Sequence, residues 1–153
     1  MAEELRPNQI LLRIPGRLEW LDLVDRTAGG IASQLDFSQE DADGVANSVL
    51  EAGTNAIQHG HRYNPDLPVD ILFEIYPDRL RVRVHDEGPG FDAEKVLRAD
   101  PTDPQCLLAQ RGRGIFIMRS LMDEVCFEIG EHSGCTAILT KYRRPGSAVE
   151  DAG

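Results

Sequence analysis

The stretch Glu51-Ala-Gly-Thr-Asn55-Ala-Ile-Gln-His59-Gly60 ends a segment whose apolar residues recur at helical spacing. These apolar residues are Val45, Val49, Ala52 and Ala56. Their period predicts an amphipathic helix over residues 39–60 that packs one face on the core. Glu51, Asn55 and His59 are spaced four residues apart, so a helix projects them from one face, at the edge of that buried stripe.

The residue types on this helix face fit phosphate chemistry. The side-chain carbonyl of Asn55 is a hard oxygen ligand of the kind that Mg²⁺ accepts. Glu51, one turn earlier, can accept a proton from an attacking hydroxyl or water. A solvated helix face ending in His59-Gly60 is the alternative when this stretch is taken alone.

A second motif, Asp86-Glu-Gly88-Pro-Gly90-Phe91, follows a predicted strand. A carboxylate at a strand end can accept a hydrogen bond from an exocyclic amino group such as that of adenine, whereas guanine offers a carbonyl there and is rejected. Gly88 and Gly90 allow the backbone to pass close to a flat base. An ordinary surface turn is the alternative, since Asp-x-Gly is common in loops.

The third motif, Arg111-Gly112-Arg113-Gly114, precedes a helix predicted from Ile115 to Met122. Glycines at a helix N-terminus let main-chain N–H groups approach an anion, and arginines pair with phosphate oxygens. Solvated arginines on a flexible attachment are the alternative.

A fourth motif, Gly134-Cys-Thr136, begins the last predicted strand, where the Thr136 hydroxyl either contacts base or phosphate or belongs to an ordinary β-branched strand residue. The three cysteines, Cys106, Cys126 and Cys135, lack metal-site spacing. Cys126 and Cys135 can face each other across a hairpin, but we expect reduced, packed thiols.

The order of elements predicts the fold class. Strands are predicted at residues 8–14, 67–76, 80–85, 124–129 and 135–142, and helices at 17–36, 39–60 and 115–122. Strands joined as hairpins, with helices in separate runs, indicate an α/β (α+β) two-layer sandwich: a mixed, mostly antiparallel sheet with helices on one face. Gly29-Gly30 inside the first helix predicts either a bend or a close approach of another backbone.

Composition limits the function. Length predicts one domain over residues 1–153, with a frayed tail at 144–153. A net charge of −10 disfavours direct contact with nucleic acid and either serves solubility or meets a basic protein. No apolar run reaches the ~18–20 residues of a membrane span, and no secretory signal is present, so we expect a cytoplasmic protein.

The four motifs, in this order, resemble those of the GHKL ATPase superfamily, whose members include gyrase, heat-shock chaperone, histidine kinase and mismatch-repair ATPases. Within it the chain looks most like the bacterial anti-sigma-factor serine-protein kinases, over roughly residues 8–143. The resemblance implies a histidine-kinase-like ATPase fold with ATP and Mg²⁺ as cofactors, under a flexible ATP lid at about residues 91–112. It implies that Glu51 is the catalytic base and Asn55 the metal ligand. Nucleotide-binding residues implied by position are Asn55, His59, Asp86, Gly88, Gly90, Arg111, Gly112, Arg113, Gly114 and Thr136.

The resemblance also implies an activity. Such proteins phosphorylate a serine of an anti-anti-sigma protein, bind a sigma factor when that partner is absent, and are often homodimers, so the expected role is transcription regulation by partner switching. Two alternatives remain. One is an ATP-binding partner-switch module with little or no kinase activity, and the other is an ATP-binding component of another two-component-like regulatory system.

Overall fold

The structure is a computed structural model, which describes residues 4–60, 64–88, 109–130 and 134–143. Most of the predicted lid, residues 91–108, lies outside this part of the chain, as do Gly90, Cys106 and the predicted tail at 144–153.

One sheet carries the described strands. They are β1 (Gln9–Ile14), β2 (Val69–Ile75), β3 (Arg79–Asp86), β4 (Glu124–Ile129) and β5 (Cys135–Tyr142). Their order across the sheet is β1-β2-β3-β5-β4. The prediction was a mixed, mostly antiparallel sheet, and every described pairing is antiparallel. The bounds predicted for β4 and β5 are confirmed.

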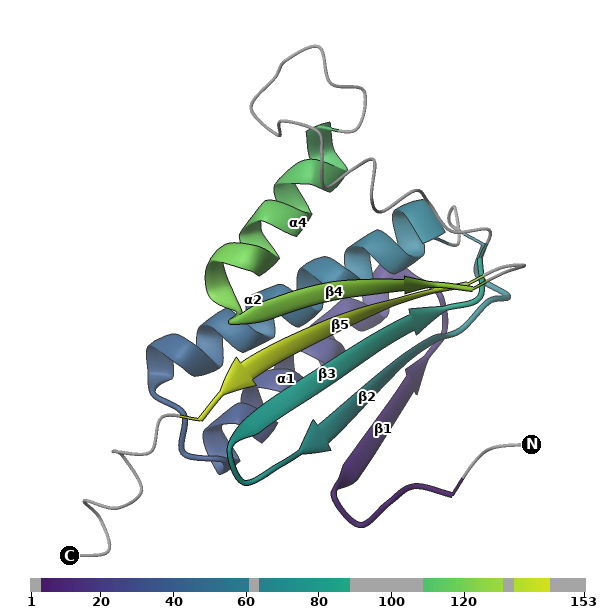
Figure 1. The fold of residues 1–153 in the computed structure, drawn as a ribbon. Helices are drawn as coiled ribbons and strands as arrows, with labels where there is room; N and C mark the ends of the chain where they lie inside the picture. The colour runs from purple at the N-terminus through teal and green to yellow at the C-terminus, as the bar shows by residue number, and fades with distance from the viewer. Residues whose placement is uncertain (1–3, 61–63, 89–108, 131–133, 144–153) are drawn as a thin grey trace, which may run out of the picture.

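Helices cover one face of this sheet (Figure 1), which confirms the predicted two-layer sandwich. They are α1 (Leu21–Gln34), after a 3-10 turn at Leu18–Trp20, α2 (Gln39–Asn55) and α4 (Ala109–Leu121). Burial alternates along β3, where Leu80, Val82 and Val84 point to the helices and the intervening arginines face away. Within the described ranges, no helix is long and apolar enough to cross a membrane.

Helix α2 lies between the other two helices and organises the core. The main-chain N–H of Asp41 donates to Ser38 Oγ at 3.1 Å, which caps the start of α2. One side of α2 packs on α1 and the other on α4, where Gly44 lies against Leu121. A third side, with Val45 and Val49, is fully buried toward the sheet.

Each helix differs in its boundaries from the prediction. Helix α1 was predicted over residues 17–36 and covers Leu21–Gln34. Helix α4 begins at Ala109, six residues before the predicted start at Ile115, so Arg111–Gly114 lies inside the helix and not ahead of it. Helix α2 changes into a π-helical turn at Ala56–Gly60. Because a π turn holds more residues than an α turn, the regular spacing predicted for His59 does not continue from Asn55.

The question raised by Gly29-Gly30 is also answered. Helix α1 runs through both glycines without interruption. A Cβ placed on Gly29 would lie 3.9 Å from the Ala46 side chain, an ordinary contact, and one on Gly30 would meet nothing within 4 Å. A close approach of another backbone therefore does not explain these residues.

Candidate functional site

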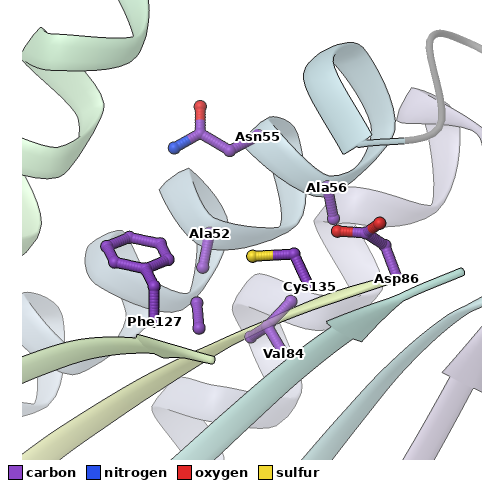
Figure 2. Close-up of a pocket in the computed structure, with 8 residues that line it drawn as sticks. Ala52, Asn55, Ala56, Val84, Asp86, Phe127 and Cys135 are labelled. Atoms are coloured by element: carbon purple, nitrogen blue, oxygen red, sulfur yellow. The ribbon is translucent and has the colours of Figure 1, made fainter. Parts of the chain in front are cut away.

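A small recess opens where the C-terminal half of α2 faces the ends of β3 and β5 (Figure 2). It is lined by Ala52, Asn55, Ala56, Val84, Asp86, Phe127, Cys135 and Ala137. Most of these side chains are apolar, and three carry polar groups: the Asn55 amide, the Asp86 carboxylate and the Cys135 thiol. A mainly apolar wall with a few placed polar groups is the kind of lining that small-molecule sites have.

Asp86 places a carboxylate at the end of β3, buried to 3% exposure. Loss of solvation raises the pKa of Asp86 to about 6, although the Gly88 N–H, which donates to Asp86 Oδ1 at 3.1 Å, and the neighbouring His85 work in the opposite direction. At neutral pH the group is therefore mostly ionised and acts as an acceptor. It suits an exocyclic amino group and repels a carbonyl.

The second and fourth motifs pack directly together. Gly134 has φ +89, and a Cβ there would lie 2.9 Å from the Asp86 carbonyl oxygen, so only glycine fits. The Gly134 N–H donates to the Gly88 carbonyl at 2.7 Å. Cys135 pairs with Asp86 across the sheet and turns its thiol into the recess. Burial, with a smaller effect of the Asp86 charge, raises the pKa of Cys135 to about 12, so the group stays a thiol.

Thr136, which the sequence singled out, lies on the other face of the sheet. Its Oγ1 is 2.8 Å from His85 Nδ1, and His85 Nε2 is 2.6 Å from a Glu87 carboxylate oxygen. Thr136 is therefore not brought to the recess, and the motif contributes Cys135 in its place. Neighbouring residues of a strand point to opposite faces of the sheet, so Cys135 and Thr136 cannot both face the recess. Cys135 pairs with Asp86 and therefore shares its face. This alternation was the signal in the sequence that could have identified Cys135.

The structure also tests two predictions for Cys126 and Cys135: that they can face each other across a hairpin, and that they are reduced, packed thiols. Cys126 pairs in register with Ile138 and not with Cys135, and both Cys126 and Cys135 are free. Cys126 is exposed, so the prediction of a packed thiol is wrong for it, whereas Cys135 is buried as predicted.

The first and third motifs also meet. A Cβ on Gly114 would lie 3.1 Å from Glu51 Oε2 and 3.3 Å from Asn55 Nδ2, so α4 approaches the polar edge of α2 closely at this glycine. Asn55 is 7% exposed, and its Nδ2 has no hydrogen-bond partner among the described residues. A buried N–H donor without a partner can be completed by an acceptor on a bound ligand, such as a phosphate oxygen.

These residues fit a magnesium nucleotide. Asn55 offers a hard oxygen beside the Glu51 carboxylate, and Mg²⁺ typically takes one or two protein oxygens and the rest from phosphates and water. The described part of the chain holds no group of three or more His, Cys, Asp or Glu side chains that could bind a metal.

For the other predicted site residues, the structure gives the position in the fold or the exposure to solvent. Gly88 is buried beside Asp86, and Arg113 is exposed on α4. Arg111 and Gly112 lie in the first turns of α4, and His59 lies in the π-helical turn. Gly90 is outside the described residues.

Known proteins resemble this chain in sequence and in fold. The chain is 33% identical to the serine-protein kinase RsbW of Bacillus subtilis (strain 168) over 139 residues, which cover 88% of this chain and 86% of the relative. It is 33% identical to the serine-protein kinase RsbW of Staphylococcus aureus (strain MSSA476) over 152 residues, covering 92% and 94%. The catalytic domain of the histidine kinase ThkA shares the fold, with a TM-score of 0.52 and 15% identity over 87% of this chain and 97% of that one. The histidine kinase-like ATPase domain family matches residues 14–141, and the chain belongs to that GHKL-type family.

Proposed function

We propose that this chain is an ATP-dependent serine-protein kinase and anti-sigma factor of a cytoplasmic partner-switching system. Its substrate is a serine of an anti-anti-sigma protein, and it binds a sigma factor when that protein is not available. The observation that carries the proposal is the meeting of Glu51, Asn55 and Gly114 beside a recess that holds the buried Asp86. Similarity to relatives named serine-protein kinases over most of the chain supports the choice of substrate class.

Each of these residues has one task in this proposal. Asp86 accepts a hydrogen bond from the adenine amino group and thereby fixes the base. Asn55 supplies an oxygen ligand to Mg²⁺, which neutralises charge on the phosphates when bound. Glu51, next to Asn55, orients the serine hydroxyl and accepts its proton as the phosphoryl group is transferred.

The position of Gly114 explains how α4 takes part. With no side chain, Gly114 allows α4 to lie against the Glu51 carboxylate and the Asn55 amide. The position of α4 thus determines the position of the base and the metal ligand. Whether ATP or ADP is bound would then bias which protein partner fits, since each nucleotide stabilises the arrangement that binds it better.

The test is transfer of labelled γ-phosphate from Mg·ATP to the anti-anti-sigma protein encoded nearest this gene. We expect label on serine with the wild-type protein and none with Glu51→Ala, while both bind ATP. Transfer that persists in Glu51→Ala would assign the base elsewhere. Tight ATP binding without labelling would replace the kinase with a nucleotide-gated binding module. Equilibrium sedimentation of the same preparation tests the homodimer that forms part of the proposal.

A further inference from the structure

Helix α4 has two different faces. Gly114, Ile115 and Met118 are buried toward α2 and the core. Phe116 is 62% exposed, the highest value among the described large hydrophobic side chains, and Ile117 is 36% exposed. Two consecutive large apolar side chains are thus exposed together on α4, and an apolar patch rimmed by polar residues is a feature of interaction surfaces.

Charge on α4 differs from charge on the rest of the chain. The helix holds three arginines, Arg111, Arg113 and Arg119, and no acidic residue, in a chain of net charge −10. Its neighbour α2 holds the acidic residues Glu40, Asp41, Asp43 and Glu51 and no basic residue. The cationic character of α4 is therefore local.

The arginines border the exposed aromatic ring. Arg113 precedes Phe116 by three residues and Arg119 follows it by three, so all three share one helix face. Both arginines are exposed, and neither forms an ion pair with another residue of the described ranges. Arg113 also lies near the N-terminus of α4, where the helix dipole disfavours a positive charge. Arg119, by contrast, lies in the last turn of α4, where the dipole favours a positive charge, so Arg113 is the arginine whose position the helix itself does not explain.

We propose that the outer face of α4, formed by Arg113, Phe116, Ile117 and Arg119, is the docking surface for the protein substrate. The matching surface of that substrate is an apolar patch bordered by carboxylates, which would pack on Phe116 and pair with the arginines. This inference rests on the proposed kinase function and names where its protein partner binds.

The position of the surface agrees with this role. Gly114, two residues before Phe116, lies against Glu51 and Asn55 on the inner side of the same helix. The width of a helix with its side chains is ~10–12 Å, so a protein held on the outer face of α4 has its neighbouring loops within reach of the predicted base. Binding on α4 would also act on the helix whose glycine positions Glu51 and Asn55.

The experiment compares Phe116→Ser and Arg119→Glu with the wild-type protein. The probe is the anti-anti-sigma protein encoded nearest the gene, titrated by calorimetry in the presence of a non-hydrolysable ATP analogue. We expect Phe116→Ser to raise the Kd for this protein about tenfold or more, the usual effect of removing an aromatic hot spot. Arg119→Glu should raise it as well and reduce its dependence on ionic strength. Leu23→Ser, at a 41% exposed apolar position on α1, is the matched control and should change neither value.

The outcomes separate the docking surface from the kinase proposal. The Kd for the ATP analogue and the free energy of unfolding should stay at their wild-type values in both α4 variants. Normal serine labelling with an unchanged protein Kd in both variants would overturn the docking surface and leave the kinase proposal intact. A loss of stability in Phe116→Ser would show that the chain itself covers this face, which also overturns the inference. A wild-type protein that neither binds nor labels the probe would overturn both.

Discussion

At the scale of single residues, Asp86 sets function against stability. Burial raises its pKa from 3.8 to about 6, so the folded chain holds a carboxylate that its surroundings disfavour at neutral pH. A pKa change of this size corresponds to about 3 kcal/mol. We expect Asp86→Asn to raise the free energy of unfolding of the nucleotide-free protein by up to about 3 kcal/mol at neutral pH, as measured by urea denaturation, because the amide can still accept the Gly88 N–H.

The same substitution should weaken ATP binding by ~1–3 kcal/mol, since the adenine amino group loses a charged acceptor and meets an amide. A more stable variant with weaker ATP affinity is the result expected of a buried residue kept for function. If the variant gains no stability, the carboxylate is better solvated than its burial indicates. If it binds ATP as well as the wild-type protein does, another group reads the base.

The pH dependence of stability gives a second prediction for Asp86. Its pKa is higher in the folded chain than the ordinary value of 3.8, so its stabilising contribution is complete below about 3.8, decreases as pH rises, and is lost above about 6. The free energy of unfolding of Asp86→Asn minus that of the wild type should therefore grow as pH rises through about 6 and then level off. A difference that stays constant across this range, in urea titrations at several pH values, would contradict the assignment.

Gly114 gives a third prediction, because its missing side chain matters to the site and not to the helix. In Gly114→Ala the new methyl group would lie 3.1 Å from Glu51 Oε2 and 3.3 Å from Asn55 Nδ2. Alanine favours a helix by about 1 kcal/mol over glycine, and the cost of shifting the two contacted side chains offsets this gain, so the free energy of unfolding should change little. We expect phosphate transfer and Mg²⁺-dependent ATP binding to fall at least tenfold, since Glu51 and Asn55 are displaced from their positions.

Gly30→Ala is the matched control for this prediction. Gly30 is also helical, and a Cβ there would meet nothing within 4 Å. The control should gain about 1 kcal/mol of stability with unchanged transfer. Equal activity of Gly114→Ala and Gly30→Ala would show that the close approach of α4 does not position Glu51 and Asn55.

The sequence predicted part of this site for physical reasons that can be stated. Helical spacing placed Glu51 and Asn55 together, since local periodicity determines which residues share a helix face. Asp86 followed from its place at a strand end. Cys135 was missed because the motif was judged by the hydroxyl of Thr136, whereas the register of β5 against β3 decides which side chain enters the recess. The contact of Gly114 with α2 depends on tertiary packing, which no local pattern contains.

At the scale of elements, Lys141 fixes the end of α4 that is remote from the site. Lys141 is 8% exposed, and its Nζ donates to the Leu121 carbonyl at the end of α4 at 2.9 Å. It also lies 3.7 Å from an Asp41 carboxylate oxygen at the start of α2. Lys141→Met keeps the stem but removes the charge, and we expect a loss of about 1–3 kcal/mol of unfolding free energy by urea denaturation.

The control for Lys141 is the exposed ion pair of Arg26 and Asp22, which lie 3.0 Å apart on α1. Arg26→Met should cost about 0.5 kcal/mol or less, since exposed pairs contribute little. Similar losses in both variants would mean that Lys141 does not hold α4 and α2 together.

The element boundaries show where a local pattern is sufficient. The bounds of β4 and β5 were predicted in full, although burial alternates only along the first part of each strand. Helix α4 was predicted to begin at Ile115, after Gly112 and Gly114, and glycine has low helix propensity. In the structure the helix begins at Ala109, and packing of Ile115 and Met118 against α2 outweighs that propensity. The change to a π turn at the end of α2 had no local signal either.

At the scale of the whole molecule, the topology assembles the site from four distant motifs. The antiparallel pairing of β3 with β5 joins Asp86 to Gly134 and Cys135, and the packing of α4 on α2 joins Gly114 to Glu51 and Asn55. A ligand that spans both pairs therefore connects the sheet to two helices. Binding to the folded chain alone must stabilise all of these elements together.

This linkage gives a prediction for the whole fold. At an ATP concentration of 100 times Kd, with excess Mg²⁺, binding adds ~2.7 kcal/mol to the free energy of unfolding. For a chain of this size each kcal/mol raises Tm by ~2–4 °C, so Tm should rise by roughly 5–11 °C. Calorimetry of Asn55→Ala should show the same Tm shift with and without Mg²⁺, because this variant lacks the ligand that couples the metal to the fold. Asp86→Asn should need a higher ATP concentration for an equal shift and keep the difference that Mg²⁺ makes. If Asn55→Ala retains the full Mg²⁺ effect, the metal is held by other groups, and the buried amide of Asn55 is not its ligand.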